Sequence, residues 1–339
     1  MKKKYFRFII LYFLLVMSLF NFPPKVTATV STANEIGYHI YSIAPENQIN
    51  NDNSFFDLRM KPNQEQTIEF VIANTSDIDQ TYTIELNQAY TNNQGYIDYS
   101  ENKNSPSNIN KQFSIEQIAK IQKNVTVHKQ STTKIPINLK MPSEQYDGEI
   151  LAGIRVIKQP ENHDSKSIVN EYGYILGLRL TETDKELQRL IQLNNIKPEV
   201  SFGKTSVVIT LQNPIMESYG NLNYEVKIQN KEKPDIIKQK SFTGLQMAPN
   251  SLYNFSVDWD GERIVAGDYR MNLRITDKKS NKWEFTKDFK IQTQEANKVN
   301  KVVIRDTSIM GNKLIIILSL IIILIFTIVY YAWYKRKSN

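Results

Sequence analysis

Histidines and paired acidic residues are the side chains of this sequence with the clearest potential for catalysis or metal binding. The three histidines, His39, His128 and His163, lie far apart along the chain, and cysteine is absent, which excludes thiolate nucleophiles and thiolate metal sites. The sequence contains no nucleophile elbow, His-Glu-x-x-His pair or phosphate-binding glycine loop. The acidic pairs at 77–79 and 258–260 offer fewer ligands than a calcium loop needs. We therefore predict no catalytic residue, no metal site and no cofactor.

A tyrosine-containing polar loop offers a different chemistry, the binding of saccharides. The stretch 88–111 is rich in asparagine, lacks periodicity and is long for a loop in a compact domain. Tyrosine rings can stack on the C–H faces of sugars, and amide side chains can hydrogen-bond their hydroxyl groups. The alternative is that these rings only close one end of the domain. The candidate ligand-binding residues are Tyr90, Thr91, Asn92, Tyr96 and Tyr99.

Short β-strands are the elements that we expect to position these residues. Apolar and polar side chains alternate in segments such as 67–73 and 81–86, and turn residues separate the segments at intervals of about ten residues. A helical turn or two at 113–121 is the one helical pattern in this part of the chain. A second series of about seven alternating segments runs from 192 to 291, which is the strand number of an immunoglobulin-like domain.

The pattern thus predicts an all-β fold with two tandem immunoglobulin-like β-sandwich domains. A charged stretch without alternation, at 181–187, marks the boundary between them. We expect the first domain at 30–181 and the second at 186–293. The polar segment that follows, 294–312, is predicted to be a juxtamembrane stalk.

Both ends of the sequence carry segments typical of export and membrane insertion. Basic residues, an apolar stretch at 8–20 and small residues near position 28 predict a signal peptide over 1–28. An uninterrupted apolar run of about 19 residues at 314–332 approaches the roughly 20 that a membrane-spanning helix needs. We expect a transmembrane helix at 313–334 and a cytoplasmic tail at 335–339. The predicted membrane-interface anchors are Trp333, Tyr334, Lys335, Arg336 and Lys337.

The predicted localisation is therefore the cell membrane, as a single-pass protein with its ectodomain facing the cell wall and its C-terminus in the cytoplasm. The formal net charge of +7 does not indicate a nucleic-acid partner. Eight of the 42 Lys and Arg residues lie in the first 25 and last five positions, so the remaining 34 face 35 acidic residues and give a net charge of −1. An exported chain without cysteine also favours a bacterial source.

A succession of short motifs resembles the family of WxL-interacting surface proteins of low-GC Gram-positive bacteria. The resemblance covers essentially the whole chain, and it depends on the order and spacing of the motifs together. We expect turn geometry to account for the glycines in these motifs. The motifs are Pro62-x-x-x-x-Thr67, Asn74-Thr75, Ala89-Tyr90-Thr91-Asn92-x-x-Gly95-x-Ile97-x-Tyr99, Met141-Pro142, Tyr146-Asp147-Gly148-x-Ile150-Leu151-x-Gly153-Ile154, Leu193-Asn194, Ile196, Pro198, Leu211-Gln212-Asn213-Pro214 and Asn221-Leu222.

The resemblance implies that the first domain binds peptidoglycan and that the second binds a host extracellular-matrix protein. It also implies a complex with WxL-domain surface proteins. We therefore expect a non-enzymatic binding protein that mediates assembly and adhesion. Two alternatives remain open. A chaperone-like carrier of surface subunits would act by strand addition and would need an exposed, flat edge strand. A wall-polymer hydrolase would need paired carboxylates about 5–10 Å apart in a groove.

Overall fold

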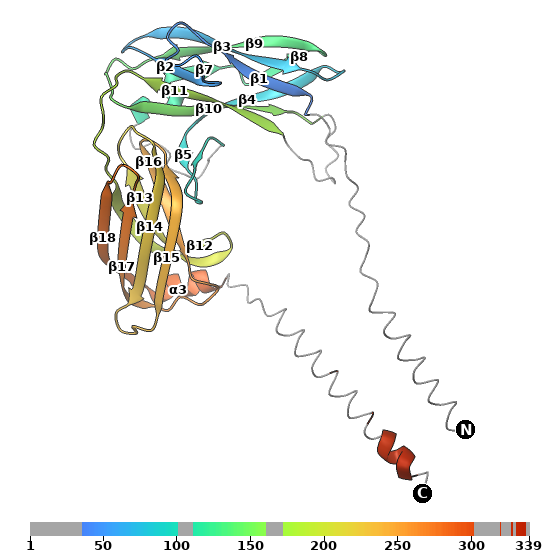
Figure 1. The fold of residues 1–339 in the computed structure, drawn as a ribbon, viewed down its shortest axis with the longest axis vertical. Coiled ribbons are helices and arrows are strands. Elements are labelled where there is room, and N and C mark those ends of the chain that lie inside the picture. Colours follow the sequence, from blue (N-terminus) through green and yellow to red (C-terminus); the bar gives the residue numbers. More distant parts are fainter. Residues whose placement is uncertain are drawn as a thin grey trace. The chain divides into compact units, whose positions relative to one another are not determined.

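The computed structural model describes residues 36–100, 111–160, 172–301 and 330–336, together with Ser319 and Thr327. The chain divides into two compact units, 1–38 and 39–339, and the account below concerns the second. Strands dominate the described chain (Figure 1), so the prediction of an all-β fold is confirmed. The predicted signal peptide, 1–28, lies outside the described residues.

The first group of strands forms two large sheets and a small hairpin. A four-stranded sheet has the order β1-β3-β9-β7, a five-stranded sheet has the order β2-β11-β10-β4-β8, and β5 pairs with β6. The strand β10 is antiparallel to β11 and β4, β4 to β8, β9 to β3 and β7, and β5 to β6, whereas β11 runs parallel to β2. The strands are β1 (Tyr38–Ile43), β2 (Phe56–Arg59), β3 (Glu65–Asn74), β4 (Gln80–Gln88), β5 (Tyr90–Thr91), β6 (Ile97–Asp98), β7 (Ala119–Ile121), β8 (Asn124–Val127), β9 (Ser131–Lys140), β10 (Glu149–Lys158) and β11 (Gly173–Thr181).

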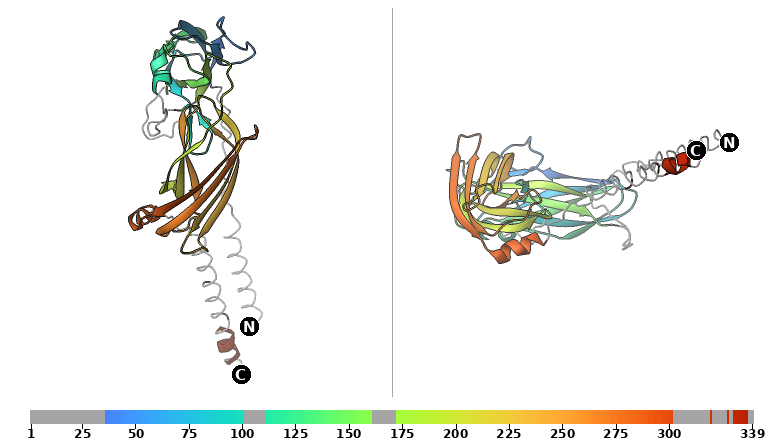
Figure 2. Two further views of the ribbon diagram at one scale, coloured as in Figure 1. Left: turned by 90° about the vertical axis from the view of Figure 1, so that its left-hand side faces the viewer. Right: turned by 90° about the horizontal axis from the view of Figure 1, so that it is seen from below.

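The second group of strands forms two sheets that share one core. A three-stranded sheet has the order β12-β13-β16, and a four-stranded sheet has the order β15-β14-β17-β18. The long strands β14, β17 and β18 lie side by side in both views of Figure 2. The strands are β12 (Gln192–Ser201), β13 (Lys204–Asn213), β14 (Tyr219–Asn230), β15 (Ile237–Met247), β16 (Ser251–Asp258), β17 (Gly267–Thr276) and β18 (Lys282–Ile291).

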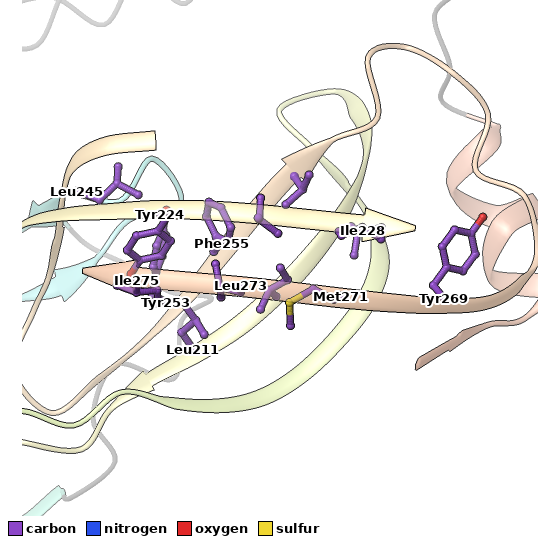
Figure 3. Close-up of a cluster of buried hydrophobic side chains, with 14 of the residues drawn as sticks. Leu211, Tyr224, Ile228, Leu245, Tyr253, Phe255, Tyr269, Met271, Leu273 and Ile275 are labelled. Carbon is purple, nitrogen blue, oxygen red and sulfur yellow. The ribbon is translucent and has the colours of Figure 1, made fainter. Parts of the chain in front are cut away.

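Buried aromatic and aliphatic side chains fill the space between these two sheets (Figure 3). The ring centroid of Tyr224, on β14, lies 5.1 Å from that of Phe255, on β16, so side chains of opposite sheets are in direct contact. Period-2 alternation produces this core, because successive side chains of a strand point to opposite faces. Figure 3 labels ten members of the cluster: Leu211, Tyr224, Ile228, Leu245, Tyr253, Phe255, Tyr269, Met271, Leu273 and Ile275.

Short helices complete the described fold. A 3₁₀ turn, η1 (Lys111–Phe113), and one α-helical turn, α2 (Ile115–Ile118), occupy most of the stretch where a helical pattern was expected. The end of that stretch is the strand β7 instead. A third helix, α3 (Thr293–Asn300), occupies the start of the segment predicted to be a stalk. Its Ala296 and Val299 are buried in the core of the second group, so this segment packs on the sheets because two small apolar residues share one helical face.

A buried ion pair joins two loops of the second group. The guanidinium of Arg189, only 10% exposed, donates to Asp277 Oδ2 at 2.7 Å and to Glu217 Oε1 at 2.7 Å. It also lies over the ring of Tyr219, 4.9 Å from its centroid. Burial on its own raises the pKa of Asp277, but hydrogen bonds from Asn281 and Arg189 outweigh burial, and the pKa is lowered. Asp277 is therefore held as a carboxylate.

The structure contradicts the predicted localisation as a single-pass protein in the cell membrane, and this prediction is wrong. Among the described residues, no helix has both the length and the apolar content needed to cross a bilayer. Such a helix needs about 20 residues, whereas α3 has 8. Four of the predicted membrane-interface anchors, Trp333, Tyr334, Lys335 and Arg336, belong to the described residues 330–336. Lys337 and most of 313–334 lie outside the described residues.

Candidate binding site

The predicted ligand-binding loop folds into a hairpin. β5 and β6 pair through Tyr90↔Asp98 and Thr91↔Ile97. The side chain of Asn92 closes the turn, because its Oδ1 accepts the backbone N–H groups of Gln94, at 3.0 Å, and of Tyr96, at 3.1 Å. The position of the turn follows from the turn-forming asparagine and from Gly95, whose φ is +84°. Residues 101–110 of the loop are not among those described.

This hairpin is held against the β15–β16 end of the second group. The hydroxyl oxygen of Thr91 accepts the backbone N–H of Ala248 at 2.9 Å and lies 3.1 Å from Ser251 Oγ. The backbone N–H of Gln246 donates to Gly95 O at 2.7 Å. A methyl group on Gly95 would lie 2.7 Å from the hydroxyl of Tyr253. The hairpin therefore serves as a structural contact between the two groups of strands.

The five predicted residues consequently have unequal access to a ligand. Thr91 is buried, and Tyr90 is 8% exposed with its hydroxyl 2.8 Å from Ser100 Oγ. Burial raises the pKa of Tyr90. Asn92 is engaged in the turn, while Tyr96 is 47% exposed and Tyr99 is half-buried. The role of the set as a ligand site stays a prediction, and Tyr99 is the member that lies beside a groove.

That groove, of about 630 Å³, lies over the outer face of β10 and β11. Its lining is part apolar and part polar: Ser54, Phe55, Ile97, Tyr99, Glu149, Leu151, Ile175, Leu176, Gly177, Leu178, Arg179, Ser218 and Gln246. Volumes of roughly 300–1,000 Å³ are usual for ligand pockets. Two features organise this one, a pair of aromatic rings and a cluster of charged side chains.

Two facing glycines provide the space for the rings. Gly153 on β10 pairs with Gly177 on β11. A methyl group on Gly153 would lie 2.6 Å from Tyr99 Cβ, and one on Gly177 would lie 3.3 Å from Phe55 Cβ. Glycine inside a strand often marks such a close approach. Turn geometry therefore does not account for Gly153, although it holds for Gly95 and for Gly148, whose φ is +97°.

Two charged side chains of the lining, Glu149 and Arg179, form a cluster with Asp57. Arg179 donates through Nε to Glu149 Oε2 at 2.6 Å and through Nη1 to Asp57 Oδ1 at 2.9 Å. Glu149 Oε1 accepts the backbone N–H of Ser218 at 2.9 Å and its hydroxyl at 2.6 Å. Burial alone lowers the pKa of Arg179, but both carboxylates outweigh it and raise the pKa. The two carboxylates therefore hold the guanidinium in place.

Several residues that line the groove were not predicted from the sequence. Phe55, Glu149, Arg179 and Gln246 are far apart in sequence, and none belongs to a local motif of chemically related residues. The one available signal was the presence of glycine in the middle of two strands, at Gly153 and at 177. Isolated strand glycines could have indicated a side chain packed across the sheet.

The acidic pairs weighed as calcium ligands have other partners. Asp79 Oδ2 lies 2.9 Å from His128 Nδ1, and its Oδ1 accepts the backbone N–H of Lys129 at 2.9 Å. These bonds, the Lys129 bond first, lower the pKa of Asp79. Asp258 accepts a hydrogen bond from Lys204 at 2.9 Å. Within the described ranges, no group of three such ligands is placed to hold a metal ion. His163 lies outside those ranges.

Solved structures similar to this chain include fimbrial chaperone proteins. A chain of the CFA/I fimbrial chaperone–tip adhesin complex is 12% identical, with coverage of 74% of this chain and 98% of that one and a TM-score of 0.31. A chain of the CsuC–CsuE pre-assembly complex of Acinetobacter baumannii is 11% identical, with coverage of 75% and 97% and a TM-score of 0.31. The E. coli chaperone DraB is 12% identical, with coverage of 67% and 89% and a TM-score of 0.24. Likenesses this distant support no functional assignment.

Comparison with protein families identifies the chain more directly. No curated protein sequence matches it. Residues 38–158 match the family described as WxL Interacting Protein, peptidoglycan binding domain. Residues 163–301 match the family described as WxL Interacting Protein, host binding domain. The two matches span most of the sequence and follow the expected order. The chain therefore belongs to the WxL Interacting Protein family, with a peptidoglycan-binding domain followed by a host-binding domain.

Proposed function

We propose that this chain is a non-enzymatic protein that holds peptidoglycan in the groove over β10 and β11. The observation that carries the proposal is the pair of rings, Phe55 and Tyr99, standing over facing glycines beside hydrogen-bonding groups. Aromatic faces and polar groups together suit a carbohydrate polymer. All but two of the lining residues lie in the proposed first domain, 30–181, and the family description of 38–158 names peptidoglycan as the ligand class.

The proposed second domain, 186–293, binds protein partners. Its family description is host binding, and we propose WxL-domain surface proteins and a host extracellular-matrix protein as its partners. The sheet orders β12-β13-β16 and β15-β14-β17-β18, with a shared core, support an immunoglobulin-like sandwich for this domain. We propose the same architecture for the first domain, whose two large sheets also contribute alternating buried residues.

The arrangement of the groove argues against the hydrolase alternative. Glu149 is the carboxylate that lines the groove, and Asp57 binds the same guanidinium as Glu149. The second oxygen of Glu149 is occupied by Ser218, and that of Asp57 accepts Asn53 Nδ2 at 3.2 Å. A general acid needs a raised pKa and a general base needs a free oxygen. Neither carboxylate is arranged for such a role.

The proposal is tested by sedimenting the purified chain with insoluble peptidoglycan. We expect Tyr99→Ala and Phe55→Ala to lower the retained fraction several-fold, because each removes a ring from the groove. Tyr41→Ala is the matched control, since Tyr41 is 46% exposed on β1, in the other large sheet. Circular dichroism checks that each variant folds. Equal retention of all variants by the polymer would contradict the assignment of this groove.

A further inference from the structure

Some hydrogen-bonding groups of the groove are bound to other protein groups, whereas others have no protein partner. Gln246 Oε1 accepts the backbone N–H of Ile97 at 3.0 Å, which fixes the orientation of the amide and leaves Nε2 as its other end. Arg179 uses Nε and Nη1 for the two carboxylates. Within the part of the chain that the structure describes, neither Gln246 Nε2 nor Arg179 Nη2 has a protein partner. The groove therefore offers two N–H donors to a ligand.

The carboxylates, by contrast, already accept hydrogen bonds from the protein at each oxygen. Glu149 is bound by Arg179 and Ser218, and Asp57 by Arg179 and Asn53. A ligand ammonium group would therefore have to compete with protein donors at each of these oxygens. The three charged side chains sum to −1, so a ligand carboxylate would meet a net like charge. The groove is thus matched to an uncharged group that accepts hydrogen bonds.

The apolar lining narrows the chemistry of this group. Phe55, Tyr99, Leu151 and Ile175 surround the donors, and Ile175 is 49% exposed. A donor that loses its contact with water when a ligand binds costs free energy unless an acceptor meets it, while methyl and C–H surfaces gain from contact with such walls. An acetamido group combines both requirements, because its carbonyl oxygen accepts two hydrogen bonds and its methyl group is apolar.

We propose that the groove recognises the acetamido groups of an N-acetylated glycan strand, and not the charged peptide stems attached to it. The inference rests on the proposed function and names the part of the polymer that is bound. Gln246 and Arg179 donate to the acetamido carbonyl oxygen, and the two rings contact the methyl group and the sugar C–H faces. Gln246 belongs to the region that matches the host-binding family, so both family regions contribute to one site.

The test compares soluble ligands on the purified full chain by calorimetry. The probes are an N-acetylglucosamine tetramer, its de-N-acetylated counterpart and a soluble stem peptide. We expect the N-acetylated tetramer to bind and to displace the protein from insoluble peptidoglycan. The de-N-acetylated tetramer should bind at least tenfold more weakly, because each acetamido group is replaced by an ammonium group. Weaker binding of the N-acetylated tetramer than of the stem peptide would overturn the inference and leave peptidoglycan binding intact.

The variant Gln246→Glu tests the contribution of the donor Gln246 Nε2 by itself. The variant keeps an oxygen for the N–H of Ile97 and replaces the free Nε2 by a second oxygen. Gln239→Glu is the control, since it makes the same change of charge on an exposed residue of the same strand. We expect at least a tenfold loss of affinity for the N-acetylated tetramer with Gln246→Glu and an unchanged affinity with Gln239→Glu. Equal affinities would refute the role of Gln246, and failure of the native chain to sediment with peptidoglycan would refute the proposed function as well.

Discussion

Replacement of Gly153 by alanine tests how a strand glycine shapes the groove. The added methyl group would lie 2.6 Å from Tyr99 Cβ, 2.8 Å from Tyr99 Cγ and 3.0 Å from Ile175 Cγ2. Separations under about 3 Å between carbon atoms cannot be accommodated without movement. Because Cβ and Cγ are the stem of the ring, rotation of the side chain cannot relieve the overlap. The ring of Tyr99 must therefore move off β10.

The size of the effect follows from two opposing contributions. Overpacking by one methyl group costs about 1–3 kcal/mol, whereas alanine in place of glycine in a strand gains about 0.5–1 kcal/mol. Gly173→Ala carries only the second contribution, because its nearest neighbour would lie 3.4 Å away. The difference in the free energy of unfolding between the two variants should therefore be about 1–3 kcal/mol. Gly177→Ala, at 3.3 Å from Phe55 Cβ, should fall between them.

Two measurements check this prediction. Urea unfolding followed by far-ultraviolet circular dichroism gives the stability of each variant, and sedimentation with insoluble peptidoglycan gives binding. We expect Gly153→Ala to be less stable than Gly173→Ala and to lose retention, while Gly173→Ala keeps it. The explanation would be refuted if the two variants differed in stability by less than about 0.5 kcal/mol and Gly153→Ala sedimented with peptidoglycan as the native chain does. In that case Gly153 would not be needed for the close approach of Tyr99 to β10.

Three further predictions concern other parts of the fold. Thr91→Val should cost about 1–3 kcal/mol, because the buried N–H of Ala248 loses its acceptor, and exchange of the Ala248 amide should accelerate. The control is Thr210→Val, at a half-buried residue whose hydroxyl makes only a solvent-exposed hydrogen bond, and it should change stability by less than about 0.5 kcal/mol. The pKa of Asp277 is lower in the folded protein than its unfolded value of 3.8, so the carboxylate stabilises the fold above that value, and this stability is lost as the pH falls through the folded pKa. Asp277→Asn should remove this part of the pH dependence of the free energy of unfolding, measured by urea titration. A pH dependence equal to that of the native chain would contradict the prediction. Phe202 is exposed and has a φ of +50°, a backbone conformation in a turn that asparagine tolerates better than phenylalanine does. Phe202→Asn should therefore stabilise the protein by about 1 kcal/mol. A lower melting temperature of the variant would argue against strain at this turn.

Local patterns predicted most strands, because burial of one face of a sheet requires apolar residues at alternate positions of each strand. Every second residue of 67–73 is apolar, and the central residues of β3 have the expected buried set, Ile68, Phe70 and Ile72. The same signal predicted most of the strands in the second half. It did not predict α3, because two small apolar residues, Ala296 and Val299, carry little periodic signal until the sheets that they cover are in place.

The candidate site shows where local reasoning ends. Residue types near Tyr90 and Thr91 indicated a saccharide site, but docking of the hairpin on β15 and β16 uses the hydroxyl of Thr91 and buries the ring of Tyr90. Only Tyr99 and Tyr96 keep access to a ligand. A side chain's type states which bonds it can make, and the tertiary fold decides whether another part of the protein has already made them.

The sequence alone determined the all-β class, the order of the strands and the family, because these depend on alternation and motif spacing along the chain. The tertiary structure decided which strands are neighbours, and so brought Phe55, Glu149, Arg179 and Gln246 to one groove. It also gave Gly153 its role, since Tyr99 reaches that glycine only after the sheet has formed. Such contacts join residues that are far apart in sequence, and no local pattern encodes their meeting.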